Sequence, residues 1–174
     1  MKAILLITSI LFFAVFTQAQ GIPSTIKAQG MEMAKALVKK DYTTFAKYMH
    51  PKVVEMAGGS AKLLQQMDTL NAMAAKFGAE IKKITIGNPA KIIKYKKELQ
   101  TTIPQITEMT SSFGSLSMET TLVAISSDEG KTWKFVDTTA TSVSQLKKAM
   151  PELSPDLVIP APKPPVIVPN KVRQ

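Results

Sequence analysis

The chain has 174 residues, a formal net charge of +9 and no cysteine. Without cysteine there are no disulfides, thiolate nucleophiles or thiolate metal ligands, so an ordinary apolar core must stabilise the fold. Lysine carries the positive charge, and Arg173 is the single arginine. Because readers of nucleic acid rely on arginine forks and clustered aromatic residues, nucleic acid is not expected as a partner.

Residues 1–19 have the pattern of a secretory signal peptide. Lys2 precedes an uncharged apolar run from Ala3 to Phe16, and Ala19 is a small residue suited to cleavage. The run is too short for a membrane span, which needs ~20 apolar residues. We therefore expect an exported protein, periplasmic or extracellular, with no membrane span after the signal is cleaved.

The first half of the mature chain has helical periodicity. Apolar residues recur at helical spacing up to Val38, and Asp41 is placed to cap a second, short helix. The pair His50-Pro51 is expected to end that helix, because the residue before proline avoids helical angles. Residues 52–56 are predicted to be extended or turn-like.

A long helix is predicted between Ser60, as its N-cap, and Gly78. Its apolar residues recur every three or four positions, and we expect this stripe to pack on a sheet. The stripe consists of Leu63, Met67, Leu70, Ala74 and Phe77.

From residue 80 onward the apolar period changes to two, which indicates strands. The expected strands are residues 80–87, a long strand at 91–103 that continues beyond Pro104, and residues 116–125 and 132–138. A capping box formed by Ser142 and Gln145 then begins a short last helix.

Residues 21–150 are therefore expected to form one α+β domain, with N-terminal helices packed on a curved antiparallel sheet and a short C-terminal helix. Residues 151–174 form a proline-rich tail that is also apolar. Since a polar linker would lack those apolar residues, the tail is expected to lie along the domain or to bind a partner.

Residues 126–133, with the sequence SSDEGKTW, resemble the Asp-box found on hairpin turns of sialidases and other secreted proteins. An aspartate at Asp128 can accept N–H groups across its own turn, and Gly130 can adopt the left-handed conformation. Propellers carry the box once per blade, whereas this chain carries it once. The motif predicts a hairpin and does not support a glycosidase activity.

The order of elements over residues 25–140 resembles the nuclear-transport-factor-2-like superfamily, also called cystatin-like or SnoaL-like. The resemblance also rests on Lys40-Asp41-Tyr42-x-x-Phe45, on Tyr48-x-His50-Pro51 and on Gly58-Gly59. Many secreted Bacteroidetes proteins look similar over this stretch. The resemblance implies a cone-shaped fold; members of the superfamily include isomerases, dehydratases, cyclases and non-catalytic binders.

We expect an apolar pocket between the long helix and the sheet. Trp133, Phe135 and Asp137 alternate along the last strand, so they share one face, and large aromatic side chains favour the interior. With Tyr95 and Phe77 they are the candidate pocket residues. The leading hypothesis is a non-catalytic ligand-binding or interaction domain of the cell envelope. A small apolar or anionic ligand and a homodimer are the partners considered.

The alternative is a small cofactor-free acid–base enzyme of the isomerase or dehydratase type. Its candidate groups are Asp137, whose pKa would rise in an apolar setting, His50, the only histidine, and Tyr95. Each also has a structural interpretation: His50 suits a helix C-terminus, and Asp137 suits a strand end. One histidine, no cysteine and scattered acids predict no metal site, and no cofactor is expected.

Lysines recur through the stretch from Lys82 to Lys97. They would form either a patch for an anionic ligand or lipid headgroup, or a solvated sheet surface that resists aggregation.

Overall fold

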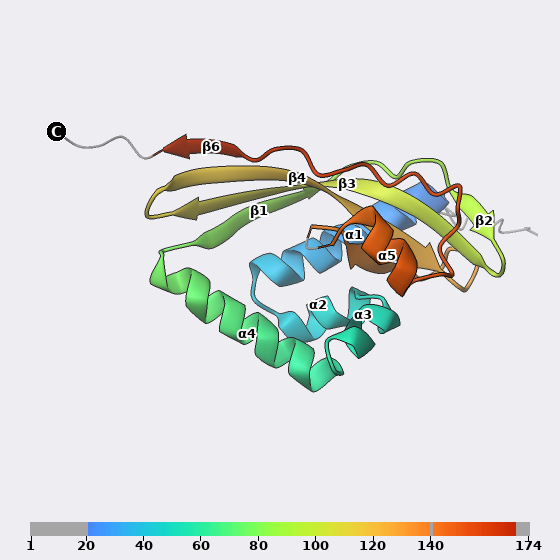
Figure 1. Cartoon of the computed structure of the whole chain (residues 1–174), viewed down its shortest axis with the longest axis horizontal. Coiled ribbons are helices and arrows are strands. Elements are labelled where there is room, and N and C mark those ends of the chain that lie inside the picture. Colours follow the sequence, from blue (N-terminus) through green and yellow to red (C-terminus); the bar gives the residue numbers. More distant parts are fainter. Residues whose placement is uncertain (1–20, 140, 170–174) are drawn as a thin grey trace, which may run out of the picture.

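The computed structural model describes residues 21–139 and 141–169, so the predicted signal peptide lies outside the described residues. Within these ranges the chain has an α+β fold in which helices cover an antiparallel sheet of six strands, as predicted (Figure 1). The sheet is open. In the same ranges, no helix has the length and apolar character needed to cross a bilayer.

Four helices make up the first half of the described chain: α1 (Ile22–Val38), α2 (Tyr42–Tyr48), α3 (Pro51–Met56) and α4 (Ser60–Lys76). Asp41 caps α2 as predicted, because its Oδ1 accepts the backbone N–H of Thr44 at 3.0 Å. The side chain of Asp41 thereby fixes the point at which the chain leaves α1 and enters α2.

The prediction that residues 52–56 are extended or turn-like is wrong, because they belong to helix α3. Pro51 is the first residue of this helix, where its fixed φ and missing N–H cost nothing. His50 occupies the N-cap, and its Nδ1 accepts the backbone N–H of Lys52 at 3.2 Å. The pair His50-Pro51 therefore ends one helix and begins the next.

Helix α4 begins one residue earlier than predicted. Ser60 is the first helical residue, and Gly59 is the N-cap with a φ of 97°. That left-handed angle favours glycine, as does the φ of 88° at Gly58, so the pair makes the sharp link from α3 to α4. Gly78 has a φ of 60° after the helix, as predicted.

The strands are β1 (Glu80–Ile86), β2 (Ile93–Tyr95), β3 (Glu98–Ser111), β4 (Gly114–Ser126), β5 (Lys134–Asp137) and β6 (Val166–Pro169). Strands β3 and β4 form the long central pair, with β1 and β2 along the free side of β3. Strands β5 and β6 pair with opposite ends of β4. The short helix α5 (Val143–Ala149) follows β5.

The predicted long strand at 91–103 is wrong, because a tight turn divides it into β2 and the beginning of β3. Lys96 adopts a φ of 52° at this turn, and Tyr95 pairs with Glu98 across it. No glycine or asparagine marks the turn in the sequence. Pro104 pairs with Thr121 of β4, and it is tolerated within β3 because the opposite side of the strand has no regular partner there: β2 pairs only up to Gln100, and β1 pairs only from Gln105.

The Asp-box hairpin between β4 and β5 is confirmed. Asp128 accepts the backbone N–H of Thr132 at 2.9 Å and its hydroxyl at 2.6 Å, while Ser126 Oγ donates to Asp128 at 2.8 Å. Gly130 has a φ of 89°. The indole Nε1 of Trp133 donates to the carbonyl of Gly130 at 3.0 Å, so the tryptophan closes the turn from inside.

The main core lies between the sheet and α1. Ile26 and Met33 of α1 pack with Ile86, Trp133 and Phe135 of the sheet side, and all five are buried. A Cβ atom on Gly30 would lie 3.3 Å from Ile86 and 3.6 Å from the ring of Phe135. Gly30 therefore allows α1 to approach the sheet closely, and α1 rather than α4 covers the inner face.

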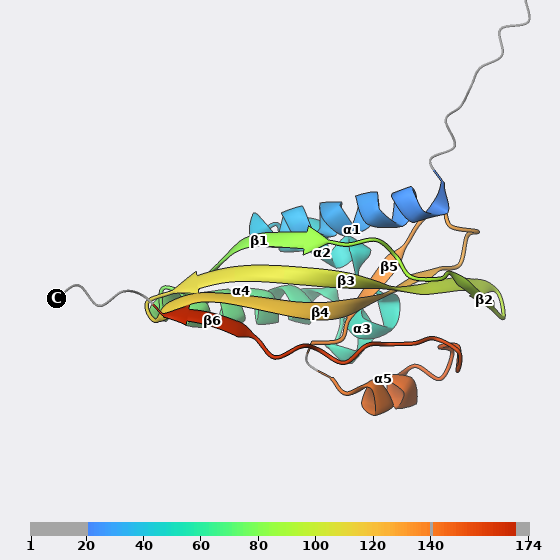
Figure 2. The ribbon, with the colours of Figure 1, turned by 90° about the horizontal axis from the view of Figure 1, so that it is seen from above.

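The tail lies along the domain. It forms a second core with α5 on the outer face of the sheet, where Leu153, Leu157 and Ile159 pack with Val123 and Val136. Figure 2 shows the tail running beside β4 until it joins the sheet as β6. Polar contacts also hold the tail on this face of the sheet; in one of these contacts, Gln100 accepts the backbone N–H of Ser154 at 2.8 Å. The side chains of Val166, Ile167 and Val168 in β6 are exposed.

The predicted burial of the α4 stripe against the strands is wrong. Leu63 is buried, but the side chains of Leu70 and Phe77 are 61% and 58% exposed. Helix α4 packs mainly on α2 and α3, and in Figure 1 it runs below the sheet at the level of those helices. Its apolar side faces a groove instead of a closed core.

Candidate functional site

The two aromatic candidates of the last strand belong to the main core. Trp133 is 1% exposed and Phe135 is fully buried, and their neighbours come from α1 rather than from the long helix. The sequence correctly predicts that both point inward. Their surroundings are filled by side chains, so the structure gives them a packing role.

The other predicted pocket residues lie in different places. Asp137 is exposed at the end of β5, where it accepts hydrogen bonds from Gln105 Nε2 at 3.2 Å and from the backbone N–H of Thr139 at 2.7 Å. The ring of Tyr95 on β2 lies 5.3 Å from the ammonium of Lys96. Phe77 is at the end of α4, so the five predicted pocket residues do not come together.

His50 acts as the N-cap of α3 and is half-buried. Burial lowers the pKa of its imidazole, and the carboxylates of Glu98 and Glu152 oppose that effect. The neutral ring accepts at Nδ1 and supplies a structural hydrogen bond. His50 and Asp137 have different hydrogen-bond partners, so the structure does not pair them as an acid and a base.

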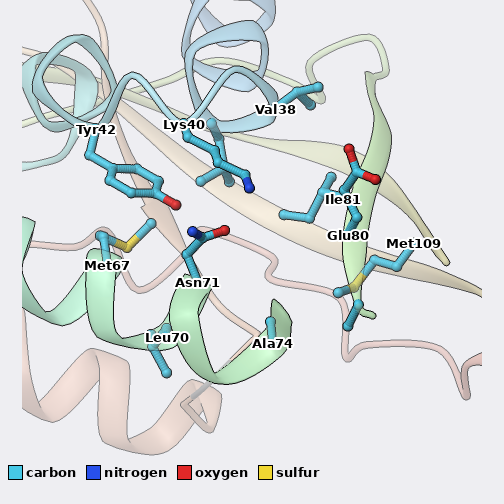
Figure 3. Close-up of a pocket in the computed structure, with 12 residues that line it drawn as sticks. Val38, Lys40, Tyr42, Met67, Leu70, Asn71, Ala74, Glu80, Ile81 and Met109 are labelled. Atoms are coloured by element: carbon cyan, nitrogen blue, oxygen red, sulfur yellow. The ribbon is translucent and has the colours of Figure 1, made fainter. Parts of the chain in front are cut away.

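A groove with apolar walls lies between α4, the junction of α1 with α2, and the start of β1 (Figure 3). We refer to it as the α4 groove. Its volume is about 240 Å³. The apolar lining includes Val38, Met67, Leu70, Ala74, Ile81 and Met109. The exposed side of α4 therefore forms one wall of a concave surface.

Three polar side chains project into the α4 groove from two directions. Lys40 and Tyr42 come from the junction of α1 with α2, and Asn71 comes from α4; their polar ends point toward one another in Figure 3. Within residues 21–139 and 141–169, these three side chains form no hydrogen bond or ion pair with protein groups. An ammonium, a hydroxyl and an amide are thus available to a ligand.

The backbone fixes Lys40 at this position. Lys40 follows the C-cap of α1 and has a φ of 60°, a left-handed angle that favours glycine. Its N–H donates to the carbonyl of Leu37 at 3.0 Å, and the next N–H, of Asp41, donates to Ala36 at 2.9 Å. These two bonds form a Schellman motif, which turns the chain so that Lys40 faces α4.

Neighbouring charges influence the groove's polar groups without neutralising Lys40. Glu80 lies on the groove wall, but its carboxylate pairs with Lys82 at 2.5 Å, which lowers the pKa of Glu80 more than Lys40 does. Burial, with a smaller contribution from Asp68, raises the pKa of Tyr42. The hydroxyl of Tyr42 therefore stays protonated at neutral pH and can donate a hydrogen bond.

The basic stretch from Lys82 to Lys97 is divided between two places. Lys83 lies 3.8 Å from Glu108 on the neighbouring strand, so the part on β1 is an ion-paired sheet surface. Lys94 and Lys96 lie at the β2–β3 turn, where they border a cleft together with Glu98. The stretch is therefore not one continuous patch.

The sequence predicts an apolar pocket between the long helix and the sheet, but it does not identify the polar residues of the α4 groove, because these come from separate elements. The spacing of Tyr42 from Phe45 and Met49 indicates only an apolar side of α2, and Asn71 has no motif around it. One local signal was present: the lysine at position 40 follows a helix where glycine or asparagine is usual. In the described parts of the chain, no cluster of three or more His, Asp or Glu side chains is arranged to hold a metal ion.

Comparisons of the chain with protein-family models and with curated proteins find no match. Its function is therefore inferred from the groove and from the residues that line it.

Proposed function

We propose that this chain is an exported, non-catalytic ligand-binding domain whose site is the α4 groove. The observation that carries the proposal is the combination of an apolar wall with three unpaired polar groups in one concavity. Binding sites for small molecules have this composition, since apolar surface supplies affinity and a few polar groups fix orientation. Without a ligand in the groove, the side chain of Leu70 stays largely exposed to water, which is unfavourable for an apolar group.

The size of the groove supports a small ligand. Pockets for drug-sized molecules have volumes of ~300–1000 Å³, and this groove has about 240 Å³. A short alkyl chain or a single ring matches that space, whereas a large cofactor would extend far outside it.

A binding role is favoured over the acid–base alternative by the positions of the candidate catalytic groups. Asp137, His50 and Tyr95 occupy the end of β5, the N-terminus of α3 and strand β2. Acid–base catalysis needs two such groups directed at one reacting atom. His50 and Asp137 bond different partners, and the ring of Tyr95 contacts Lys96, so the three groups are not joined in that arrangement.

Membership of the nuclear-transport-factor-2-like superfamily and export are parts of the same proposal. Helices followed by a run of antiparallel strands, with the Gly58-Gly59 link before the long helix, agree with the resemblance seen in the sequence. The pattern of residues 1–19 supports export to the periplasm or the exterior. Mass spectrometry of the exported protein would test this part by the loss of about 19 residues.

Binding can be tested with 1-octanol, an uncharged probe with a short alkyl chain. Methionine methyl groups labelled with ¹³C report on the groove, because Met67 and Met109 line it while Met73 lies on the exposed side of the same helix. We expect octanol to shift the first two resonances and to leave that of Met73 unchanged.

A pair of variants distinguishes binding in the groove from binding elsewhere on α4. Ala74→Phe places a ring in the groove and is expected to abolish the shifts, whereas Ala75→Phe, at the neighbouring exposed position, is expected to keep them. Absence of octanol binding to the wild-type protein, or equal binding by Ala74→Phe, would contradict the proposal.

A further inference from the structure

We infer that the ligand of the α4 groove is an apolar chain ending in a single carboxylate, and that Lys40, Tyr42 and Asn71 hold this carboxylate. The inference rests on the proposed function and adds the chemical class of the ligand. It follows from the kind of polar group that the groove presents and from the charges around it.

The three side chains supply donors with few competing acceptors. The ammonium of Lys40 has three N–H donors, the amide of Asn71 has two, and the hydroxyl of Tyr42 has one. A carboxylate accepts through two oxygens, and hydrogen bonds between charged partners are stronger than neutral ones. With no protein acceptor bonded to these donors among the described residues, a ligand carboxylate is their natural complement.

The balance of charge selects a monoanion. Among the described residues, Lys40 is the one cation that lines the groove. The carboxylates of Glu80 and Asp68 lie close enough to affect their neighbours, since Glu80 senses Lys40 and Tyr42 senses Asp68. A dianion such as a phosphate monoester would bring two negative charges to the single ammonium of Lys40, because Glu80 is already paired with Lys82 and the carboxylate of Asp68 lies nearby. A carboxylate carries only the charge that Lys40 compensates.

The backbone of Lys40 gives an independent reason to assign this residue a role. A left-handed φ of 60° is unfavourable for a side chain with a Cβ atom, and glycine would occupy the position without strain. The Schellman hydrogen bonds use only backbone atoms, so they do not require lysine. What lysine adds here is the ammonium that projects into the groove.

The inference predicts different affinities for octanoate, 1-octanol and octyl phosphate, which share one alkyl chain. At low ionic strength we expect octanoate to bind about tenfold more tightly than octanol, and the difference to shrink as salt rises. Octyl phosphate is expected to bind more weakly than octanoate. Calorimetry or methionine methyl shifts of the full mature protein would give the three affinities.

Two substitutions at Lys40 separate the effect of its charge on binding from the effect of its backbone conformation on stability. Lys40→Met keeps the stem and should remove the preference for octanoate while octanol still binds. Lys40→Gly should also remove it, and should raise the melting temperature by about 2–4 °C because the strained φ is relieved. Lys39→Met is the matched control, since Lys39 has right-handed backbone angles and does not line the groove; it should retain the preference.

The outcomes distinguish this inference from the proposed function. If octanol binds in the groove but octanoate binds no better, or if Lys40→Met keeps the preference, the carboxylate assignment is wrong and the binding role stands. Tighter binding of octyl phosphate would also overturn it. If none of the three probes binds to the wild-type protein, both proposals fail.

Discussion

Gln29 of α1 is hydrogen-bonded to the backbone N–H of Trp133, with 2.7 Å between Oε1 and N. The same amide donates through Nε2 to the carbonyl of Lys131 at 2.9 Å. The side chain of Gln29 thus pairs with one backbone N–H and one backbone carbonyl of the segment that leads from the Asp-box turn into β5. These bonds join α1 to the hairpin at a point far away in the sequence, next to Gly30, where the helix meets Phe135.

Gln29→Ala should therefore destabilise the protein by about 1–2 kcal/mol, because it leaves the N–H of Trp133 partly buried without its partner. Urea unfolding followed by tryptophan fluorescence measures this change. Lys27→Ala serves as the control: the bond of Lys27 to Asn88 is exposed, so its loss should change stability by less than about 0.5 kcal/mol. Equal effects of the two substitutions would show that the amide of Gln29 does not anchor α1.

The Asp-box predicts a dependence of stability on acid pH. Hydrogen bonds from the hydroxyl and backbone N–H of Thr132, with Ser126 adding a smaller effect, lower the pKa of Asp128 to about 2. The unfolded chain has the ordinary value of 3.8. The contribution of Asp128 is therefore complete above about pH 4 and is lost as pH falls toward 2.

Asp128→Asn keeps an acceptor oxygen but removes the titration. We expect the difference in free energy of unfolding between wild type and this variant to be constant from pH 7 to pH 4 and to shrink between pH 4 and pH 2. Urea titrations at several pH values measure it. A difference that does not change with pH would mean that the carboxylate is not held in its charged form by the turn.

Sequence signals that act within a few residues predict the local structure correctly. Asp41 and its bond to Thr44, and Ser142 with Gln145, are caps whose partners lie three residues away, and the structure contains them. The Asp-box is of the same kind. In each case the residue that gives the signal also makes the hydrogen bond, so no knowledge of the tertiary fold is needed.

Ambiguous local signals gave the errors in secondary structure. His50-Pro51 ends a helix by its effect on the preceding residue, but proline also suits the first position of a new helix, and the sequence does not say which effect dominates. At Lys96 a turn occurs without glycine or asparagine, so the alternating residues on either side look like one strand.

The groove required tertiary information. Periodicity shows that α4 has an apolar side but not which surface that side faces. Leu63 at its start meets the core, while Leu70 in its middle borders the groove. Lys40 and Asn71 approach each other only because the α1–α2 junction turns toward α4.

This difference along α4 gives a direct test of how the helix sits. Leu63→Ala should cost about 2–4 kcal/mol, since Leu63 is 7% exposed. Leu70→Ala should cost less than about 1 kcal/mol, because most of that side chain is already in water. Chemical denaturation of the two variants gives the comparison. If Leu70→Ala were as costly as Leu63→Ala, the middle of α4 would have to pack on the sheet in solution.

His50 supplies the last prediction, a loss of stability in mildly acidic solution. Burial lowers the pKa of its imidazole below the ordinary value of 6.5, so between the two values the unfolded chain binds the proton more readily than the folded one. Stability from the neutral ring is complete above about pH 6.5 and falls as pH decreases through the folded pKa. The physical loss is that of the N-cap, because a protonated Nδ1 cannot accept the N–H of Lys52.

His50→Asn retains a cap at α3 and does not titrate, so the fall in unfolding free energy between pH 7 and pH 5 should be smaller in this variant than in the wild type. Thermal melts at half-unit steps of pH measure both curves; parallel curves would mean that His50 is not the group responsible.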